Sequence, residues 1–180
     1  DGPVAMKLQS RDVPHKTEVG GVALGLSDDT AISQAFDMML KAVKRKVPTA
    51  NIQGVRIEPM TPAGEEMLIG VTAEPGIGPI LTLGSGGILV ELIKDVISLP
   101  VPVTPRQSQR MVEQLRSWPI LQGHRGRAEA DVPALLDLVV KVSNFAAAQA
   151  GILRALDLNP VIVHPRGKGI SIVDVLIESS

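Results

Sequence analysis

The spacing of apolar residues predicts that short strands make up much of the chain. Apolar and polar residues alternate near the beginning, as in VAMKLQ, which is typical of a strand with one buried face. Two later apolar runs flank the glycine-containing turn HPRGKG and predict a β-hairpin. Strands are expected over Val4–Gln9, Val22–Leu26, Ile52–Met60, Glu66–Ala73, Ile80–Leu83, Asn159–Val163 and Ile170–Ile177.

Three segments show the wider apolar spacing of helices. These helices are expected over Thr30–Lys46 after a cap at Asp28 or Asp29, over Pro105–Ser117, and over Val132–Ala148 after a cap at Asp131. The stretch Gly84–Val96 is ambiguous between strand and helix, and the proline-rich Ser98–Pro105 has to be extended. Because strands and helices alternate without a regular βαβ repeat, the pattern predicts an α+β fold with mixed or antiparallel sheets.

The composition narrows the classes of function. Of the 180 residues, 44% are hydrophobic but only 2% aromatic, which predicts an aliphatic core and disfavours stacking surfaces for single-stranded nucleic acid. The net charge of −1 gives no basic field that would attract nucleic acid or a membrane surface. The chain has no cysteine, which suits the cytoplasm, and no apolar run long enough to span a bilayer. We therefore expect a cytoplasmic protein with no nucleic-acid or membrane partner.

Two glycine pairs lie beside predicted strands. Gly20 and Gly21 precede the second strand, and a second pair occurs in the run GSGG at Gly84–Gly87. Successive amide N–H groups in such a loop can bind an anion, although a glycine pair taken alone is more often a tight turn. Neither run matches the phosphate-binding motif GxxxxGK[ST] or the dinucleotide-binding motif GxGxxG.

Basic residues near the first glycine pair are candidates for phosphate binding. Lys7 lies in the middle of the first strand, where it is either an edge-strand lysine that reaches solvent or a clamp for a phosphate group. His15 and Lys16 lie in the loop before Gly20. A loop histidine is most often solvated, but a neutral imidazole beside a lysine can also attack phosphorus.

Oxygen-bearing side chains near the end of the chain are candidates for a metal site. Asn159 and Asp174 lie on the two arms of the predicted hairpin, and Asp157 lies two residues before Asn159. Mg²⁺ needs few protein oxygens when water and substrate phosphates complete its shell. The structural alternative is an Asx turn at Asn159-Pro160.

Five blocks in order resemble one enzyme family across nearly the whole chain. These are KLQS…PHKTEVGGV, GVRIEPM…GEEMLIGV, GPILTLGSGGILVELIKDV, LQGHRG and LDLNPVIV…IVDVLIE. The series is similar to the ATP-grasp domain of the ADP-forming acyl-CoA synthetases, a family that includes acetate–CoA ligase (ADP-forming) and is related to succinyl-CoA synthetase. The resemblance implies an ATP-grasp fold, in which two α+β lobes at about residues 1–60 and 61–180 clasp ATP or ADP with Mg²⁺.

The resemblance also implies a reaction and the residues that carry it. The reaction is acyl-CoA + ADP + phosphate ⇌ acid + CoA + ATP, through an acyl phosphate and phosphohistidines. In this sequence His15 is implied as a second phosphohistidine, and Asn159 and Asp174, with Asp157 nearby, as ligands of Mg²⁺. The implied nucleotide contacts are Lys7, Lys16, the flexible loop at Gly20 and Gly21, the backbone of the lobe linker at Glu58 to Met60, Glu66, and Arg125 as a phosphate contact.

The sequence also departs from the family pattern. The segment that usually precedes the first strand is absent, so we expect a fragment or processed chain that lacks the N-terminal part of its nucleotide lobe. The usual DPxFGP reads EPGIGP, and the arginine expected after ELxxDV is replaced by ISLPVPVTP. The implied partner is the CoA-binding and ligase domain or subunit of the same enzyme, and we expect an oligomer. The alternative function is that of a non-catalytic regulatory ATP-grasp-like domain, as in protein acetyltransferases.

Overall fold

The computed structural model describes residues 2–13, 15–87 and 94–180 and divides the chain into two compact units. The N-terminal unit is Asp1–Met60 and the C-terminal unit is Thr61–Ser180. Each unit has its own hydrophobic core, and each is described below by itself. Within the described residues, no helix is both long and apolar enough to cross a membrane.

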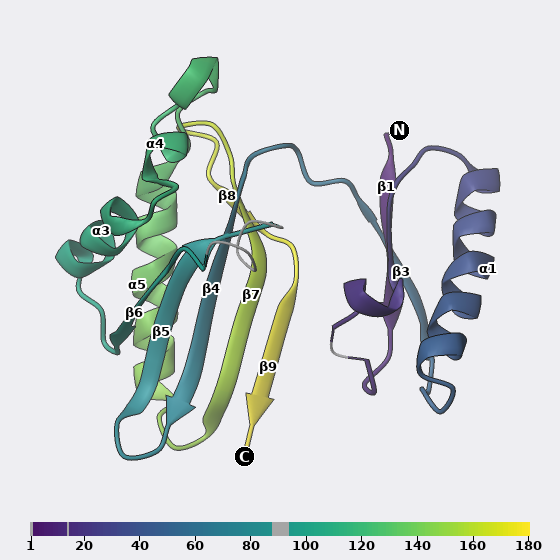
Figure 1. The fold of residues 1–180 in the computed structure, drawn as a ribbon, viewed down its shortest axis with the longest axis horizontal. Coiled ribbons are helices and arrows are strands. Elements are labelled where there is room, and N and C mark those ends of the chain that lie inside the picture. The colour runs from purple at the N-terminus through teal and green to yellow at the C-terminus, as the bar shows by residue number, and fades with distance from the viewer. Residues whose placement is uncertain (1, 14, 88–93) are drawn as a thin grey trace. The chain divides into compact units, whose positions relative to one another are not determined.

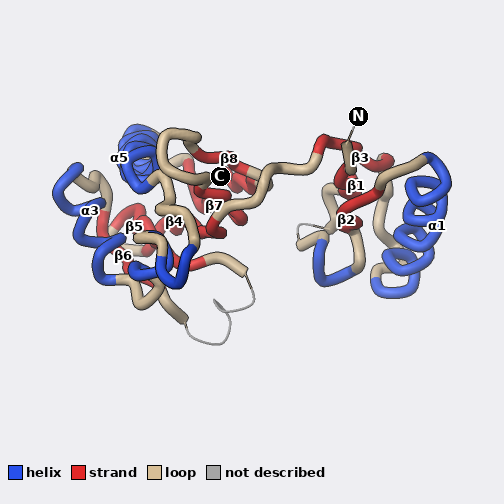
Figure 2. Tube along the Cα trace, turned by 90° about the horizontal axis from the view of Figure 1, so that it is seen from above, coloured by secondary structure: helices blue, strands red, loops and turns tan. Residues whose placement is uncertain are grey.

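The N-terminal unit is a three-stranded antiparallel sheet with one helix packed on it. Strand β1 (Val4–Gln9) lies between β2 (Val22–Leu26) and β3 (Gly54–Pro59), and α1 (Asp29–Lys46) packs on one face (Figures 1 and 2). Met6 and Leu8 of β1 are fully buried against Met39 and Val43 of α1. The alternation along β1 therefore places Lys7 on the opposite face of this sheet.

The expected caps and ends of α1 are confirmed. The Asp28 carboxylate accepts a hydrogen bond from the Ala31 N–H at 2.8 Å, which satisfies a backbone donor that the first turn leaves unpaired. The last turn carries Lys44, Arg45 and Lys46, whose charges are favourable at the C-terminal end of the helix dipole.

The C-terminal unit contains a six-stranded sheet. The strand order is β6-β5-β4-β7-β8, and β9 also pairs with β7 (Figure 1). All of these pairs are antiparallel, which is one of the two arrangements expected from the sequence. The strands are β4 (Glu65–Glu74), β5 (Gly78–Ser85), β6 (Val96–Pro100), β7 (Leu153–Val163), β8 (Ile170–Ile172) and β9 (Val175–Ser179).

Helices cover one face of this second sheet. They are α3 (Pro105–Gln114), the single turn α4 (Trp118–Leu121) and α5 (Val132–Ala148). Side chains of α3 and α5 share one aliphatic core with alternate residues of β4, β5 and β7; its members include Met67, Ile69, Leu81, Met111, Leu135, Val139 and Leu158. Asp131 caps α5 and its carboxylate also accepts from the Gly169 N–H at 2.7 Å, which fixes the turn between β7 and β8.

Several predicted boundaries differ from the structure, and two of them have an evident physical reason. The helix expected over Pro105–Ser117 ends at Gln114, because the N–H groups of Arg116 and Ser117 donate to Asp95 instead of continuing the helix. The hairpin strand expected over Ile170–Ile177 is interrupted between β8 and β9. Pro160, which follows a cis peptide bond and has no N–H, cannot contribute a donor to the ladder at this point. Part of the ambiguous stretch Gly84–Val96 lies outside the described residues.

Candidate functional site

Three charged side chains form a cluster on the face of the N-terminal sheet opposite α1. The Lys7 ammonium lies 2.8 Å from a carboxylate oxygen of Glu58, and the Arg56 guanidinium lies 2.9 Å from the other oxygen. Lys7 and Arg56 are directly opposite each other across β1 and β3, and Glu58 follows Arg56 by two residues on the same face. Hydrogen bonding from Lys7 is the main cause that lowers the pKa of Glu58, so the cluster carries a carboxylate between two cations.

This geometry excludes one alternative and corrects one expectation about the N-terminal unit. Lys7 is not an edge-strand lysine, because β1 is the central strand and Lys7 is only 7% exposed. Glu58 is not part of a linker, because it lies within β3 and its carboxylate is ion-paired. The N–H of Met60, expected to meet adenine, donates to the Pro3 carbonyl at 3.1 Å. The sequence alone did not reveal these contacts, because β3 is distant from β1 along the chain.

The loop that contains His15 is closed by its own backbone. A 3₁₀-helix at Thr17–Val19 follows Lys16, and the N–H groups of Gly20 and Gly21 donate to the carbonyls of Thr17 and Lys16 at 3.1 and 2.7 Å. A Cβ on Gly21 would lie 2.9 Å from the Lys16 carbonyl oxygen, so glycine is needed for this close turn. The two amides are therefore engaged within the loop, whereas the His15 side chain is exposed.

The expected metal ligands lie on one face of the C-terminal sheet. Leu156 and Leu158 of β7 are buried among the helices, so Asp157 and Asn159 point to the other face. The Asn159 N–H donates to the Asp174 carbonyl at 3.2 Å, which brings the two residues side by side across the strand pair. Among the described residues, no group of three or more acidic or histidine side chains forms a ready-made metal cage. An amide and two carboxylates nevertheless fit Mg²⁺, which takes few protein ligands.

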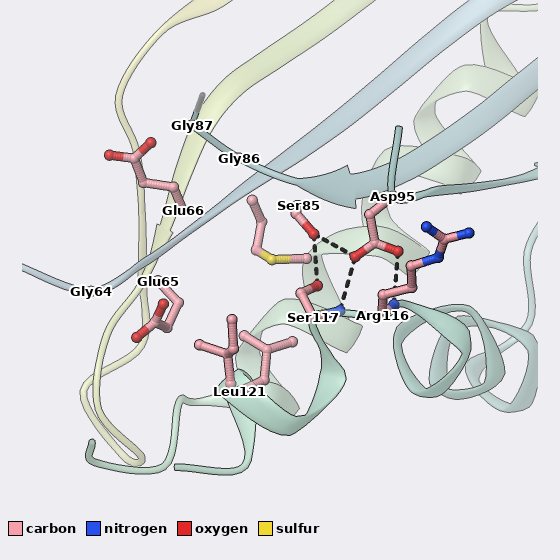
Figure 3. A pocket seen from close by; sticks show the side chains of 12 residues that line it. Gly64, Glu65, Glu66, Ser85, Gly86, Gly87, Asp95, Arg116, Ser117 and Leu121 are labelled. Atoms are coloured by element: carbon pink, nitrogen blue, oxygen red, sulfur yellow. Dashed lines mark hydrogen bonds between the residues drawn. The ribbon is translucent and has the colours of Figure 1, made fainter. Parts of the chain in front are cut away.

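The C-terminal unit also contains a pocket of about 370 Å³ that the sequence did not reveal. It lies where the end of β5 meets the segment after α3 (Figure 3). Met67, Ile120 and Leu121 supply an apolar wall. Charged side chains from three segments stand around it: Glu65, Glu66, Asp95 and Arg116.

Asp95 fixes the wall of this pocket. Its carboxylate accepts from the N–H groups of Arg116 and Ser117 at 2.7 and 2.9 Å, and lies 2.7 Å from the Ser85 hydroxyl (Figure 3). Burial alone would raise the pKa of Asp95, but these hydrogen bonds together lower it below its ordinary value. Asp95 therefore remains an anion that joins three segments. Its position after the apolar run ILVELIK was the only signal in the sequence.

Glu66 stands at the rim of the same pocket, in contact with the GSGG loop. The Gly86 N–H donates to the Glu66 carbonyl at 2.6 Å, and a Cβ on Gly86 would lie 2.6 Å from the carbonyl carbon of Glu66. The second glycine pair thus lies where the backbone at Gly86 closely approaches the backbone of Glu66. The Glu66 side chain is exposed and carries no described partner that would fix it.

Arg125 belongs to the 3₁₀-helix His124–Gly126, and its side chain lies outside the described part of the structure. Its neighbour Arg127 makes two hydrogen bonds to the Glu65 carboxylate, at 2.8 and 3.0 Å. This forked contact attaches the loop to the beginning of β4. The sequence singled out the arginine of the GHRG block, whereas the described contact is made two residues later.

Curated proteins similar to this chain include CoA ligases that are named as ADP-forming. The chain is 36% identical over 175 residues to the beta subunit of acetate–CoA ligase (ADP-forming) II from Pyrococcus furiosus, covering 97% of this chain and 74% of that protein. It is 38% identical over 175 residues to 4-hydroxybutyrate–CoA ligase (ADP-forming) from Nitrosopumilus maritimus, but covers only 25% of that protein. The chain thus spans about a quarter of the longer relatives that it matches.

Solved structures of a CoA synthetase are also similar to this chain. Acetyl-coenzyme A synthetase 1 of Ca. Korarchaeum cryptofilum, in complex with coenzyme A and Ca-AMPCP, superposes with a TM-score of 0.90 at 33% identity. The match covers 99% of this chain and 76% of that one. A second structure of the same synthetase, with Mg-AMPPCP and a phosphohistidine segment pointing towards the nucleotide binding site, has a TM-score of 0.79 at 28% identity. The α+β fold expected from the sequence is confirmed as ATP-grasp: the ATP-grasp domain family matches residues 1–178, and the chain belongs to that family.

Proposed function

We propose that this chain is the nucleotide-binding ATP-grasp part of an ADP-forming acyl-CoA synthetase. The overall reaction is acyl-CoA + ADP + phosphate ⇌ acid + CoA + ATP. The observation that carries the proposal is the match of the whole chain, with a TM-score of 0.90, to a synthetase that holds coenzyme A and a nucleotide analogue. The CoA-binding and ligase functions then belong to partner domains or subunits, since related chains include separate beta subunits.

The N-terminal unit supplies the cation for the phosphate groups. Lys7 is held in the central strand, and an ammonium group has three donors, so it can bind a phosphate oxygen without leaving Glu58. Lys16 stands at the beginning of the closed loop, where its charge adds to the attraction. Gly20 and Gly21 shape this loop, and the backbone of Met60 follows the last residue of β3.

The C-terminal unit supplies the oxygens for Mg²⁺. Asn159 and Asp174 are neighbours across the strand pair, and Asp157 shares their face of the sheet. When bound there, Mg²⁺ would offset the negative charge of the nucleotide phosphates. The charged rim at Glu66 and the arginine-bearing loop at Arg125 are proposed as further nucleotide contacts.

His15 is proposed to accept the phosphoryl group. A ring nitrogen attacks the terminal phosphorus of ATP, an N–P bond forms and the P–O bond to ADP breaks. The imidazole proton passes to solvent, which reaches the exposed side chain. In the reverse direction the same phosphohistidine returns the group to ADP.

Phosphorylation of the chain itself tests this function. The chain is incubated with Mg-ATP labelled on the terminal phosphate, and acid-labile, base-stable label is measured as the signature of phosphohistidine. We expect labelling that His15→Ala abolishes and that the matched variant His124→Ala preserves, because His124 lies in a separate exposed 3₁₀-helix. Label that survives His15→Ala would refute the role of His15.

The regulatory alternative makes a different prediction in the same experiment. A non-catalytic ATP-grasp-like domain would bind the nucleotide without accepting label at any histidine. The oligomeric state and the cytoplasmic location expected from the sequence stay predictions.

A further inference from the structure

We propose that Arg56 is a second phosphate-binding cation beside Lys7, and that Glu58 holds both side chains in place. This inference rests on the proposed nucleotide-binding function and adds a residue that the family resemblance does not supply. The group that it would bind is the phosphate chain of a nucleoside diphosphate or triphosphate.

The placement of the three side chains supports this proposal. Arg56 lies directly opposite Lys7 in the antiparallel pair of β1 and β3, so the two side chains leave the sheet next to each other on the same face. One carboxylate bridges them, with Lys7 at 2.8 Å and Arg56 at 2.9 Å from its two oxygens. Glu58 thus fixes the distance between the two cations.

The exposure of the side chains indicates which group meets a ligand. The side chain of Lys7 is 9% exposed, that of Glu58 is 28% exposed and that of Arg56 is 63% exposed. Only one of the five guanidinium donors is engaged by Glu58 in the described contact, so the others remain geometrically able to serve a phosphate. Arg56 therefore stands on the solvent side of the buried ion pair, where an anion approaches first.

The charge balance also favours an anion. Two cations and one carboxylate leave a formal charge of +1 on this face of the sheet, because the pKa of Glu58 is lowered by its hydrogen bond with Lys7. A structural ion pair between Lys7 and Glu58 would be complete without Arg56. A surface arginine that served Glu58 alone would contribute little, since exposed ion pairs are weak.

Binding of Mg-ADP to the chain tests the role of Arg56. Calorimetric titrations compare the wild type with Arg56→Gln, Arg56→Lys and Lys44→Gln, and adenosine serves as the ligand that lacks phosphate. Lys44 is the matched control, because its substitution removes the same charge from the exposed end of α1, on the other face of the sheet. Thermal unfolding of each variant confirms that it is folded.

We expect Arg56→Gln to raise the dissociation constant for Mg-ADP about tenfold, as for the loss of one charge-assisted hydrogen bond. Arg56→Lys should recover part of the lost affinity. Lys44→Gln should change the dissociation constant for Mg-ADP by less than about twofold, and the affinity for adenosine should stay constant. Equal affinities in the wild type and Arg56→Gln, or equal losses in Arg56→Gln and Lys44→Gln, would overturn this inference but leave the proposed function intact. A wild-type chain that does not bind Mg-ADP would overturn both.

Discussion

The backbone N–H of Asn159 donates a hydrogen bond to the carbonyl of Asp174 at 3.2 Å. This bond lies at the break between β8 and β9, where Pro160 interrupts the regular ladder of β7. It holds an amide side chain and a carboxylate next to each other on the sheet face that α5 leaves uncovered. Asp157, two residues earlier on β7, adds a third oxygen-bearing side chain to that face.

Removing the Asn159 amide should weaken the proposed metal site. We expect Asn159→Ala to raise the Mg²⁺ concentration needed for half-maximal nucleotide binding by about tenfold, since one direct ligand is lost. Titrations of nucleotide at a series of Mg²⁺ concentrations measure this requirement. Asn144→Ala makes the same change on an exposed position of α5 and should leave it unaltered. An identical Mg²⁺ requirement in wild type and Asn159→Ala would mean that Asn159 does not bind the metal.

Asp95 should make the stability of the chain depend on pH. Its pKa is lower in the folded chain than in the unfolded chain, so its contribution is complete above the unfolded pKa and is lost as the pH falls through the folded pKa. We expect Asp95→Asn to lower the free energy of unfolding by about 2 kcal/mol at neutral pH, from weakened charge-assisted hydrogen bonds. The difference should be smaller at about pH 3, which lies below the unfolded pKa of an aspartate, because part of the contribution of the carboxylate is then lost.

Urea unfolding at both pH values checks this prediction. Asp137→Asn provides the control, because it removes an exposed carboxylate on α5 whose only described contact is an ion pair with Lys141. A destabilisation of Asp95→Asn that is independent of pH would show that the charge of Asp95 is not what joins the three segments.

Gly86 should not tolerate a side chain. A Cβ there would lie 2.6 Å from backbone and side-chain carbons of Glu66, which cannot move away without disturbing the beginning of β4. We expect Gly86→Ala to destabilise the chain by about 1–3 kcal/mol, the usual cost of overpacking. At Gly70, in the middle of β4, the nearest atom would be 3.8 Å away, so Gly70→Ala should be nearly neutral. Similar melting temperatures for the two variants would contradict the close approach at Gly86.

The contributions of Lys7 and Glu58 to the free energy of unfolding should be coupled through their ion pair. Glu58→Gln leaves the buried Lys7 ammonium with a weaker partner, and we expect a loss of about 1–2 kcal/mol after allowing for the partial exposure of Glu58. In a Lys7→Met background the same substitution should cost much less. A double-mutant cycle by chemical unfolding measures the coupling, and additive effects of the two substitutions would show that the pair contributes nothing to folding.

Local sequence patterns were sufficient to predict the strands and the long helix of the N-terminal unit. Strand β1 follows from the alternation of Met6, Lys7, Leu8 and Gln9, and α1 begins after Asp28 because its carboxylate accepts from a first-turn amide. Both features depend only on residues close in sequence. The long helix α5 after Asp131 was predictable for the same reason.

Contacts between distant segments were not predictable in this way. Lys7 is buried only because β3 and β2 pair on either side of β1, and the alternation within β1 does not contain that information. The end of α3 is set by Asp95, whose hydrogen-bond partners Arg116 and Ser117 lie 21 and 22 residues away. Likewise, the engaged amides of Gly20 and Gly21 depend on the 3₁₀-helix, which a glycine pair alone does not predict.

Calorimetric titration of ADP into the wild-type chain, with Mg²⁺ and with a chelator in its place, tests the central proposal most directly. If the chain is the nucleotide-binding part of an ADP-forming synthetase, one ADP should bind per chain with Mg²⁺, and the affinity should fall sharply with the chelator. Absence of saturable binding in the presence of Mg²⁺ would contradict a nucleotide-binding role for this chain.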